Sequence, residues 1–314
     1  MAPPKIPPEN IDNVLYHILP RIKQHKAAQS TNPTKHPFVL ALTGLQGSGK
    51  STWTDALAST LRNKHNYQTI NISLDDLYLD HDDLVTLRKT NSRNKLLQTR
   101  GQPGTHDKAL SVSFFRSLNS SEILLPSFDK RLFNGEGGRV SSQQWERVPA
   151  GDIDVVIFEG WCVGFLPLAE DQVRMRWNKA GKSASDSMFP TATLKEHVLE
   201  HLLEVNENLR QYCELFMGPK HFDYLVHLDT NDLVNVYQWR VQQEHALWNR
   251  KARGMTDEEV VEFVKGYMPA YELYLDRLRE GIFSEEGKGQ LRVVLDQERE
   301  IIAVEDVSSK CQRS

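Results

Sequence analysis

Apolar residues along the chain occur in two distinct patterns. Short, nearly continuous apolar runs are typical of strands buried on both faces, whereas apolar residues that recur every three to four positions are typical of helices. The short runs predict five core strands and one shorter strand, at 38–42, 68–74, 153–158, 224–228, 291–295 and 123–125. The helical pattern predicts helices over 10–29, 51–64, 110–118, 194–215, 233–251 and 256–278. This alternation predicts an α/β fold with a mainly parallel sheet, helices on both faces and a ligand site at the carboxyl ends of the strands.

The same patterns divide the chain into an N-terminal helical extension with a linker, 1–36, and one large domain, 37–314. Pro20 lies inside the first helix and is expected to kink or split it, because proline has no backbone N–H. The stretch 170–190 is charged and then rich in Gly and Ser, which predicts an inserted segment with a mobile part. A lid region is expected at 233–255.

Composition and charge exclude several classes of protein. The 314 residues are 39% hydrophobic and 25% charged, as in an ordinary globular domain, and the net charge of −4 gives no electrostatic reason to bind nucleic acid. No apolar run approaches the roughly 20 residues that cross a bilayer, and the N-terminus lacks the apolar segment of a signal peptide. The scattered Cys162, Cys213 and Cys311 lack the paired spacing of a disulfide framework or zinc site. We expect a monomer in the cytoplasm, or in the nucleus, without nucleic-acid or membrane partners.

The strongest chemical signal is a complete G-x-x-x-x-G-K-S pattern between the first core strand and the first core helix. It occupies Gly44, Leu45, Gln46, Gly47, Ser48, Gly49, Lys50, Ser51 and Thr52. Backbone N–H groups in such a loop, and the dipole of the helix after it, bind phosphate. Lys50 is expected to reach the β- and γ-phosphates and the Ser51 hydroxyl to bind Mg²⁺. The motif predicts the three-layer P-loop NTPase fold, with ATP and Mg²⁺ as cofactors.

Carboxylates follow three of the predicted strands, at the edge where the phosphates are expected. Asp75 and Asp76 follow the second strand, Glu159 follows the third, and Asp229 follows the fourth. A carboxylate at this edge can hold Mg²⁺ directly or through water, or accept the proton of a substrate hydroxyl. We expect Glu159 to serve the metal. One member of the Asp75/Asp76 pair is expected to be a base while the other shapes the turn or holds Mg²⁺, and Asp229 is expected only to cap the next helix.

Two further segments offer groups for a phosphate acceptor. The stiff loop 100–107 ends in His106 and Asp107, a ring donor and a carboxylate that suit the hydroxyls of a polyol. The alternative is that Asp107 only caps the helix that follows. The polar, Gly-rich segment after it forms a loop or hairpin and carries Lys130 and Arg139, which suit an acidic substrate. A solvated charge cluster is the alternative for this segment.

Arg240 lies on a helix late in the chain, within the expected lid. A kinase lid places an arginine where it neutralises charge on the transferring phosphoryl group, and Arg240 is the candidate for this role. The alternative is a surface arginine paired with Glu244, one helical turn away.

Taken together, these segments resemble the P-loop kinases of small metabolites, such as uridine kinase, phosphoribulokinase and pantothenate kinase. More closely, the chain is similar to the D-glycerate 3-kinase family of plants and fungi. The similarity rests on seven segments, 44–52, 73–78, 101–107, 128–130, 133–137, 158–165 and 238–240. It implies that Asp75, in Asp75-Asp76-Leu77-Tyr78, is the catalytic base.

The resulting prediction is a kinase that transfers the γ-phosphate of ATP to a hydroxyl of a small polar metabolite, D-glycerate or a similar hydroxy acid. A nucleoside or pantothenate kinase of the same fold is one alternative, because the sequence cannot show whether a stacking slot for a base exists. An ATP-binding regulatory protein without acceptor turnover is the other, and the candidate base, metal ligands and lid arginine argue against it. A GTPase is the least favoured interpretation, because the guanine-reading pattern N/T-K-x-D does not occur.

Overall fold

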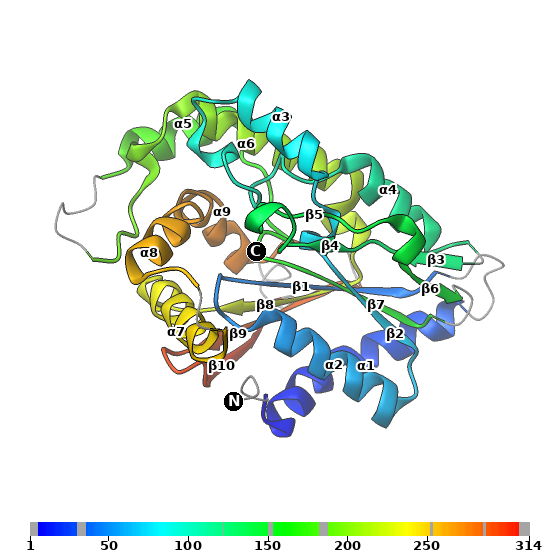
Figure 1. Ribbon diagram of the computed structural model, residues 1–314. Helices are drawn as coiled ribbons and strands as arrows, with labels where there is room; N and C mark the ends of the chain where they lie inside the picture. Colours follow the sequence, from blue (N-terminus) through cyan, green and yellow to red (C-terminus); the bar gives the residue numbers. More distant parts are fainter. Residues whose placement is uncertain are drawn as a thin grey trace.

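The computed structural model describes residues 6–29, 36–120, 122–149, 153–181, 188–251, 254–284 and 287–307. The strands of the central sheet are β1 (Phe38–Gly44), β2 (Thr69–Ser73), β7 (Val155–Gly160), β8 (Tyr224–Asp229), β9 (Gly289–Leu295) and β10 (Ile301–Asp306). Their order is β10-β9-β8-β1-β7-β2, with five parallel strands and β10 antiparallel at one edge (Figure 1). The predicted α/β fold with a mainly parallel sheet is confirmed.

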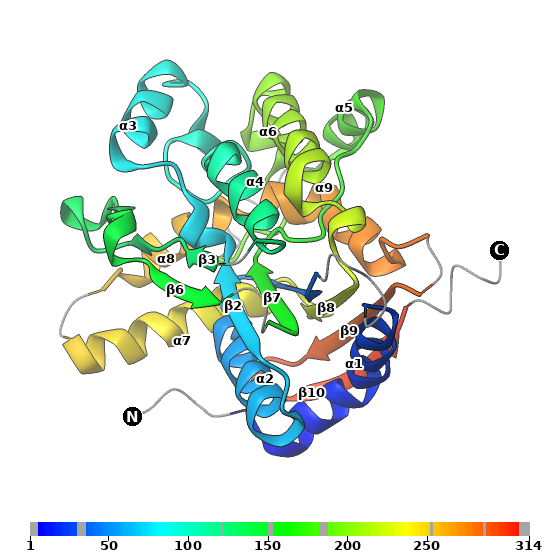
Figure 2. The ribbon, with the colours of Figure 1, turned by 90° about the vertical axis from the view of Figure 1, so that its right-hand side faces the viewer.

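Helices cover both faces of this sheet, as predicted. One face carries α1 (Pro8–Gln29) and α2 (Lys50–His65). The other carries α4 (Lys108–Ser117), α6 (Leu199–Tyr212) and α9 (Met268–Glu280), as Figure 2 shows. The remaining helices are α3 (His81–Thr90), α5 (Glu170–Lys179), α7 (Val234–Lys251) and α8 (Asp257–Lys265).

The register of the strands brings four strand ends to one edge of the sheet. β1 lies between β7 and β8, with Thr43 opposite Gly160 and Gly44 opposite Leu228. β2 pairs with β7 so that Ser73 lies opposite Glu159. Because parallel strands end at the same edge, the loops after β1, β2, β7 and β8 meet there, although they are far apart in sequence.

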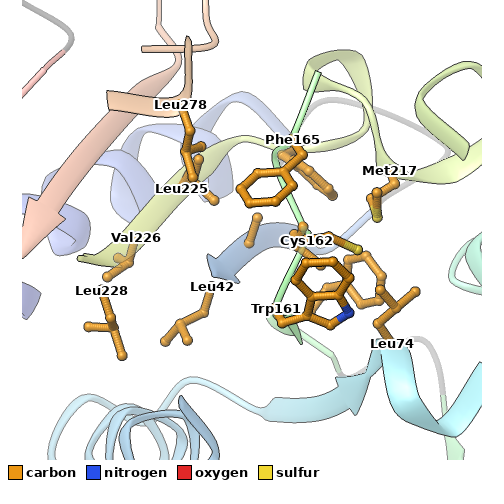
Figure 3. Packing of buried hydrophobic residues seen from close by; sticks show 14 of the residues in the cluster. Leu42, Leu74, Trp161, Cys162, Phe165, Met217, Leu225, Val226, Leu228 and Leu278 are labelled. Atoms are coloured by element: carbon orange, nitrogen blue, oxygen red, sulfur yellow. The ribbon is translucent and has the colours of Figure 1, made fainter. Parts of the chain in front are cut away.

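One apolar core holds the sheet and its helices together, and α1 contributes five buried aliphatic residues to it. Trp161 and Phe165, in the segment after β7, pack edge to face with ring centroids 5.9 Å apart. Figure 3 shows Phe165 beside Leu225 of β8 and Leu278 of α9. Burying a side chain of this size stabilises the fold by about 1.5–3 kcal/mol. The segment that follows Glu159 is therefore anchored in the core.

The predicted split of the first helix at Pro20 is wrong. α1 runs from Pro8 to Gln29 without a break. Pro20 is exposed, on the side of the helix away from the core residues Ile11 and Ile18. On that side water can bind the carbonyl group that the missing N–H of proline leaves free, so the helix continues.

The first part of the stretch 170–190, predicted as an insertion with a mobile part, folds as helix α5. Val173 is buried, and Arg176 donates a hydrogen bond of 2.9 Å to the carbonyl oxygen of Glu272 on α9. These tertiary contacts add to the ion pair between Arg174 and Glu170, one turn apart in the helix, and hold α5 against the fold. Residues 182–187 of the stretch, and 30–35 of the expected linker, lie outside the described residues.

Two predicted helices have different bounds. α6 begins at Leu199 rather than at 194. The helix expected over 256–278 is divided into α8 and α9 at Gly266, and Pro269 at the start of α9 favours a new helix N-terminus because it needs no N–H partner. The Thr256 side chain accepts a hydrogen bond from the N–H of Glu259, which confirms the predicted start of α8.

The prediction that Asp229 caps a helix is also wrong. Asp229 ends β8 fully buried, and its carboxylate accepts hydrogen bonds of 2.7 Å from Nε of both Arg279 and Arg292. Burial alone would raise the pKa of Asp229. His227 and the two arginines outweigh this effect and lower the pKa to about 2. The role of this carboxylate is therefore structural: it holds Arg279 and Arg292 at the end of β8. Asp232 instead accepts a hydrogen bond from the first N–H of α7, that of Val234.

The polar segment after α4 forms small antiparallel sheets outside the central sheet. β3 (Glu122–Leu125) pairs with β6 (Glu146–Pro149), and β4 (Phe128–Asp129) pairs with β5 (Gly138–Arg139). Of the two possibilities left open for this segment, the hairpin is the one observed.

Candidate active site

The phosphate loop, 44–52, lies between β1 and α2 as predicted. Gly47 and Gly49 have left-handed φ values of 83° and 88°, which allow successive N–H groups to turn toward one point. A Cβ at Gly47 would lie 2.7 Å from the Cβ of Trp239 on α7, so only glycine fits beneath that helix. The buried Ser48 hydroxyl has no hydrogen-bond partner among the described residues. The loop therefore presents donors, and the N-terminus of α2, to an anion that the chain itself does not supply.

Lys50, Ser51 and Glu159 come together at this loop. Lys50 Nζ donates only a long hydrogen bond, 3.3 Å, to the carbonyl oxygen of Leu45. Burial lowers the pKa of Lys50, while Glu159 and Asp75 act in the opposite direction. The Ser51 hydroxyl donates to Glu159 Oε1 at 3.3 Å, and burial raises the pKa of Glu159 although Lys50 opposes this. The structure thus places the predicted phosphate-binding lysine beside two oxygen groups that suit Mg²⁺.

Asp75 lies at the end of β2 between a phenol and an ammonium group. The Tyr78 hydroxyl donates to Asp75 Oδ1 at 2.8 Å, and Lys130 forms a close ion pair with Oδ2. Burial raises the pKa of Asp75, but Lys130 and Tyr78 together outweigh this, so the pKa lies below its usual value. Asp75 is therefore an ionised carboxylate held in a fixed orientation near Lys50.

Asp76 differs from its neighbour in both its contacts and its pKa. Its carboxylate accepts long hydrogen bonds from the N–H groups of Ser73, at 3.3 Å, and Phe128, at 3.4 Å. The first bond belongs to a capping box with Ser73, which shapes the turn after β2. Burial raises the pKa of Asp76 to about 6. In this structure Asp76 holds the backbone that presents Asp75.

His106 offers one free ring nitrogen in a buried position. The Tyr212 hydroxyl accepts hydrogen bonds from the N–H groups of Gly104 and His106, so its own hydrogen is donated to His106 Nδ1, 3.1 Å away. Burial lowers the pKa of His106 to about 3, so the ring is neutral and carries its hydrogen on Nε2. Nε2 has no partner among the described residues, and the ring stacks on Tyr78 at 4.4 Å. His106 is a hydrogen-bond donor next to the Tyr78–Asp75 pair.

Asp107 makes the contacts of a helix cap. Its Oδ1 accepts a hydrogen bond from the N–H of Leu110 at 2.9 Å, at the start of α4. Its Oδ2 accepts one from Arg139 at 2.8 Å, and Arg139 also donates to the carbonyl oxygen of Tyr78 at 3.0 Å. The capping alternative for Asp107 is confirmed. Hydroxyl binding by Asp107 and binding of an acidic substrate by Arg139 stay predictions.

The hairpin that carries Lys130 is fixed at its tip by α3. His81 stacks on Phe133 with ring centroids 3.8 Å apart, and Arg88 forms an ion pair with Glu136 at 2.5 Å. These contacts hold the strand that places Lys130 on the candidate base.

Arg240 lies close to the phosphate loop, as a lid arginine should. Its backbone nitrogen would lie 3.2 Å from a Cβ at Gly47, and its guanidinium lies 5.1 Å from the ring of Phe263 on α8. It also forms a close ion pair with Glu244, which confirms the contact named as the alternative. Its position supports the lid role, and its Nε has no hydrogen-bond partner among the described residues.

Comparison with known proteins places this site in a family, although no family model matches the chain. A solved structure of D-glycerate 3-kinase from Cryptococcus neoformans superposes with a TM-score of 0.82 at 35% sequence identity, over 94% of this chain and 98% of the other. An uncharacterized kinase of Schizosaccharomyces pombe, mug58, is 38% identical over 85% of this chain and 91% of its own. The chain belongs to the D-glycerate 3-kinase family. A probable ATP-dependent kinase of Saccharomyces cerevisiae, TDA10, is 34% identical over 77% of this chain and 79% of its own.

Membership of this family makes the protein an ATP-dependent small-molecule kinase. The structure also shows residues near this site that the sequence did not predict. Arg100 and Tyr267 of this kinase line a cavity of about 430 Å³, a volume that suits a small metabolite. Burial raises the pKa of Tyr267, Asp75 raises it further and Arg100 lowers it. The spacing of Tyr78 from Asp75 was a sequence signal for Tyr78. Tyr267 had no such signal, because it lies far along the chain from Asp75 and only the fold relates the two.

The described part of this kinase has neither a metal-binding cluster built from the protein alone nor a membrane-spanning helix. No group of three or more His, Cys, Asp and Glu side chains there could hold a metal ion. This is compatible with Mg²⁺, which keeps several waters and binds proteins through one or two ligands together with substrate phosphates. No described helix is long and apolar enough to cross a membrane.

Proposed function

We propose that this kinase transfers the γ-phosphate of ATP to a hydroxyl of D-glycerate or a similar hydroxy acid. The observation that carries the proposal is the ionised Asp75, held by Tyr78 and Lys130 at the edge of the sheet where Lys50 ends the phosphate loop. A hydroxyl between this carboxylate and the γ-phosphate can lose its proton as the new bond forms. The relatives named for D-glycerate support the choice of acceptor.

The chemical step needs little more than positioning and neutralisation of charge. Phosphoryl transfer passes through a loose transition state, so the protein mainly aligns the acceptor oxygen and stabilises charge on the γ-phosphate. Asp75 orients the hydroxyl and accepts its proton. His106 Nε2–H donates a hydrogen bond to an oxygen of the acceptor, which is the role its free nitrogen allows. Lys50 and Arg240 neutralise charge on the phosphates.

An acidic acceptor explains the positive groups on the acceptor side. Lys130 pairs with Asp75, and Arg100, which donates to the carbonyl oxygens of Gly135 and Glu136 at 2.8 and 2.6 Å, lines the cavity named above. An incoming carboxylate can bind either side chain through charge-assisted hydrogen bonds. A nucleoside offers no such anion, and a stacking slot would serve it better. The charges therefore favour a hydroxy acid over the nucleoside alternative.

The residues at the phosphate loop fit Mg²⁺ and ATP. The Ser51 hydroxyl and the Glu159 carboxylate lie 3.3 Å apart, and together with phosphate oxygens and water they would hold the ion. When bound, the metal would neutralise charge on the β- and γ-phosphates. The cytoplasm is our proposal for the compartment, supported by the free thiols Cys162 and Cys213.

The test is a screen of ATP consumption with Mg²⁺ over hydroxy acids, sugars, nucleosides and vitamins. We expect the highest kcat/KM for D-glycerate or a close hydroxy acid, and the Asp75→Asn variant serves as the matched control for contaminating kinases. Preferred turnover of a nucleoside or pantothenate would replace the proposal with the first alternative. ATP binding without turnover of any acceptor would favour a regulatory protein.

A further inference from the structure

Arg299 joins three distant parts of the chain at the back of the phosphate loop. It lies in the turn between β9 and β10. Its Nε donates to the carbonyl oxygen of Gly47 at 2.7 Å, and its terminal nitrogens donate to Gln242 Oε1 at 2.7 Å and to the carbonyl oxygen of Trp239 at 2.9 Å. All three guanidinium nitrogens are therefore used, one on the phosphate loop and two on α7.

The turn is built to hold this arginine in a conformation that it does not prefer. Arg299 has a left-handed φ of 67°, which is uncommon for residues other than glycine. Asp296 Oδ1 accepts hydrogen bonds from the N–H groups of Glu298 and Glu300, at 3.0 and 2.8 Å, and the Trp239 indole donates to the carbonyl oxygen of Gln297 at 2.8 Å. The turn is thus closed from inside and tied to α7. An arginine with only a solvent-exposed role would not need this support.

The hydrogen bond from Arg299 holds the peptide unit that precedes the phosphate-binding N–H groups of the loop. The carbonyl oxygen of Gly47 accepts from Arg299 and also, at 3.3 Å, from Gln243. Because a peptide unit is planar, holding this carbonyl also fixes the N–H of Ser48, which closes a turn onto the carbonyl oxygen of Leu45 at 3.2 Å. The N–H groups that follow belong to Gly49 and Lys50, at the start of α2. The direction of the phosphate-binding donors therefore depends on the Gly47 carbonyl.

We infer that Arg299 is a positioning residue for triphosphate binding: it fixes the Gly47–Ser48 peptide and attaches the lid helix α7 to the phosphate loop. It does so without touching the nucleotide. The inference goes beyond the proposed function, because it concerns the phosphate site alone and holds for any acceptor. It also explains why the last turn of the fold, remote in sequence from every motif, carries a half-buried arginine.

The test measures binding of Mg-ATP and of Mg-tripolyphosphate to Arg299→Asn by calorimetry, so that no acceptor is needed. Asparagine tolerates a left-handed φ, so the turn keeps its backbone while the donors are lost. Losing a charged hydrogen bond of this kind corresponds to roughly 10–100-fold weaker binding, and we expect this loss for both ligands. The melting temperature of the unliganded variant should stay near that of the wild type. Glu298→Gln, an exposed residue of the same turn, is the matched control and should bind both ligands as wild type does.

Several outcomes would overturn the inference. A folded Arg299→Asn variant with wild-type affinity for both ligands would show that the contact is only structural. Weaker binding of ATP with unchanged binding of tripolyphosphate would assign Arg299 to the nucleoside instead. If Arg299→Asn does not fold, Arg299→Lys replaces it: one ammonium cannot serve three acceptors in the guanidinium plane, so wild-type affinity of this variant for both ligands would equally refute the role.

Discussion

The phosphate half and the acceptor half of the site differ in how their charges are satisfied. In the phosphate half, Lys50 makes only one long contact and the Ser48 hydroxyl has no partner among the described residues. In the acceptor half, positive and negative side chains are already paired. These pairs are Lys130 with Asp75 and Arg139 with Asp107.

This difference indicates two modes of binding. The phosphate loop is preorganised, because the backbone fixes its hydrogen-bond donors in place. We therefore expect ATP to bind with little rearrangement of this loop. The acceptor side has to exchange internal ion pairs for contacts with the ligand. An acceptor that carries its own anion can replace Asp75 as the partner of Lys130, whereas a neutral molecule would leave the pair closed. Selection of the acceptor can therefore lie in the cost of opening these pairs.

The largest effect is expected from the preorganised half. Lys50→Ala removes the charge that the β- and γ-phosphates need, in a water-poor site where such a charge stabilises most, so activity should fall by at least about 100-fold. Calorimetry and a thermal shift assay should show loss of Mg-ATP binding with the unliganded fold intact, because burial already disfavours the charged lysine. Lys64→Ala, at the other end of α2, is the control. If Lys50→Ala kept the full thermal shift with Mg-ATP, the phosphate site would lie elsewhere.

The second-largest effect is expected at Asp75, where kcat should fall without a loss of ATP binding. Asp75→Asn keeps the shape but removes the basic lone pair, so kcat should fall by about 100-fold or more, within the range of general base catalysis, while ATP binding changes little. Asp76→Asn should lose much less, because Asp76 holds the turn. Steady-state kinetics of the two variants separates them. An inactive Asp76→Asn beside an active Asp75→Asn would exchange their roles.

Opening an ion pair of the acceptor half should change its pH dependence. Lys130 lowers the pKa of Asp75. In Lys130→Ala that pKa rises, so Asp75 takes up a proton at a higher pH and the acid limb of kcat/KM moves to higher pH. We also expect KM of the acceptor to rise by roughly tenfold, the effect of losing one charge-assisted contact. Arg131→Ala, next in the hairpin and paired with Asp129, should leave both unchanged. An unmoved acid limb would mean that Asp75 is not the titrating base.

The smallest effect is expected at Asp107. Loss of its cap should cost about 0.5–2 kcal/mol of stability, the usual range for a helix N-cap. If Asp107 also binds acceptor hydroxyls, Asp107→Ala should raise the acceptor KM or lower turnover, with ATP affinity nearly unchanged. Asp80→Ala, which removes the cap of α3, is the matched control. Equal kinetic losses in both variants, or joint loss of ATP binding and turnover, would leave Asp107 with a structural role only.

The sequence alone determined the parts of this protein that are encoded locally. The phosphate loop is one continuous segment whose glycines and lysine act through their own backbone and spacing, so its position, its helix and its strand could be predicted. The same holds for the core strands, which are apolar over their whole length because both faces are buried. Asp75 and Glu159 could be predicted because parallel strands end at one edge of the sheet.

Only the tertiary structure decided which charges meet. Asp75 lies 55 residues from Lys130, and Arg299 lies 252 residues from Gly47, so no local pattern reports these contacts. The role of the buried Asp229 was misjudged for the same reason: its partners Arg279 and Arg292 lie on α9 and β9. The sequence fixes a local conformation through backbone sterics and hydrophobic period, but ion pairs and donor geometry depend on how separate elements pack.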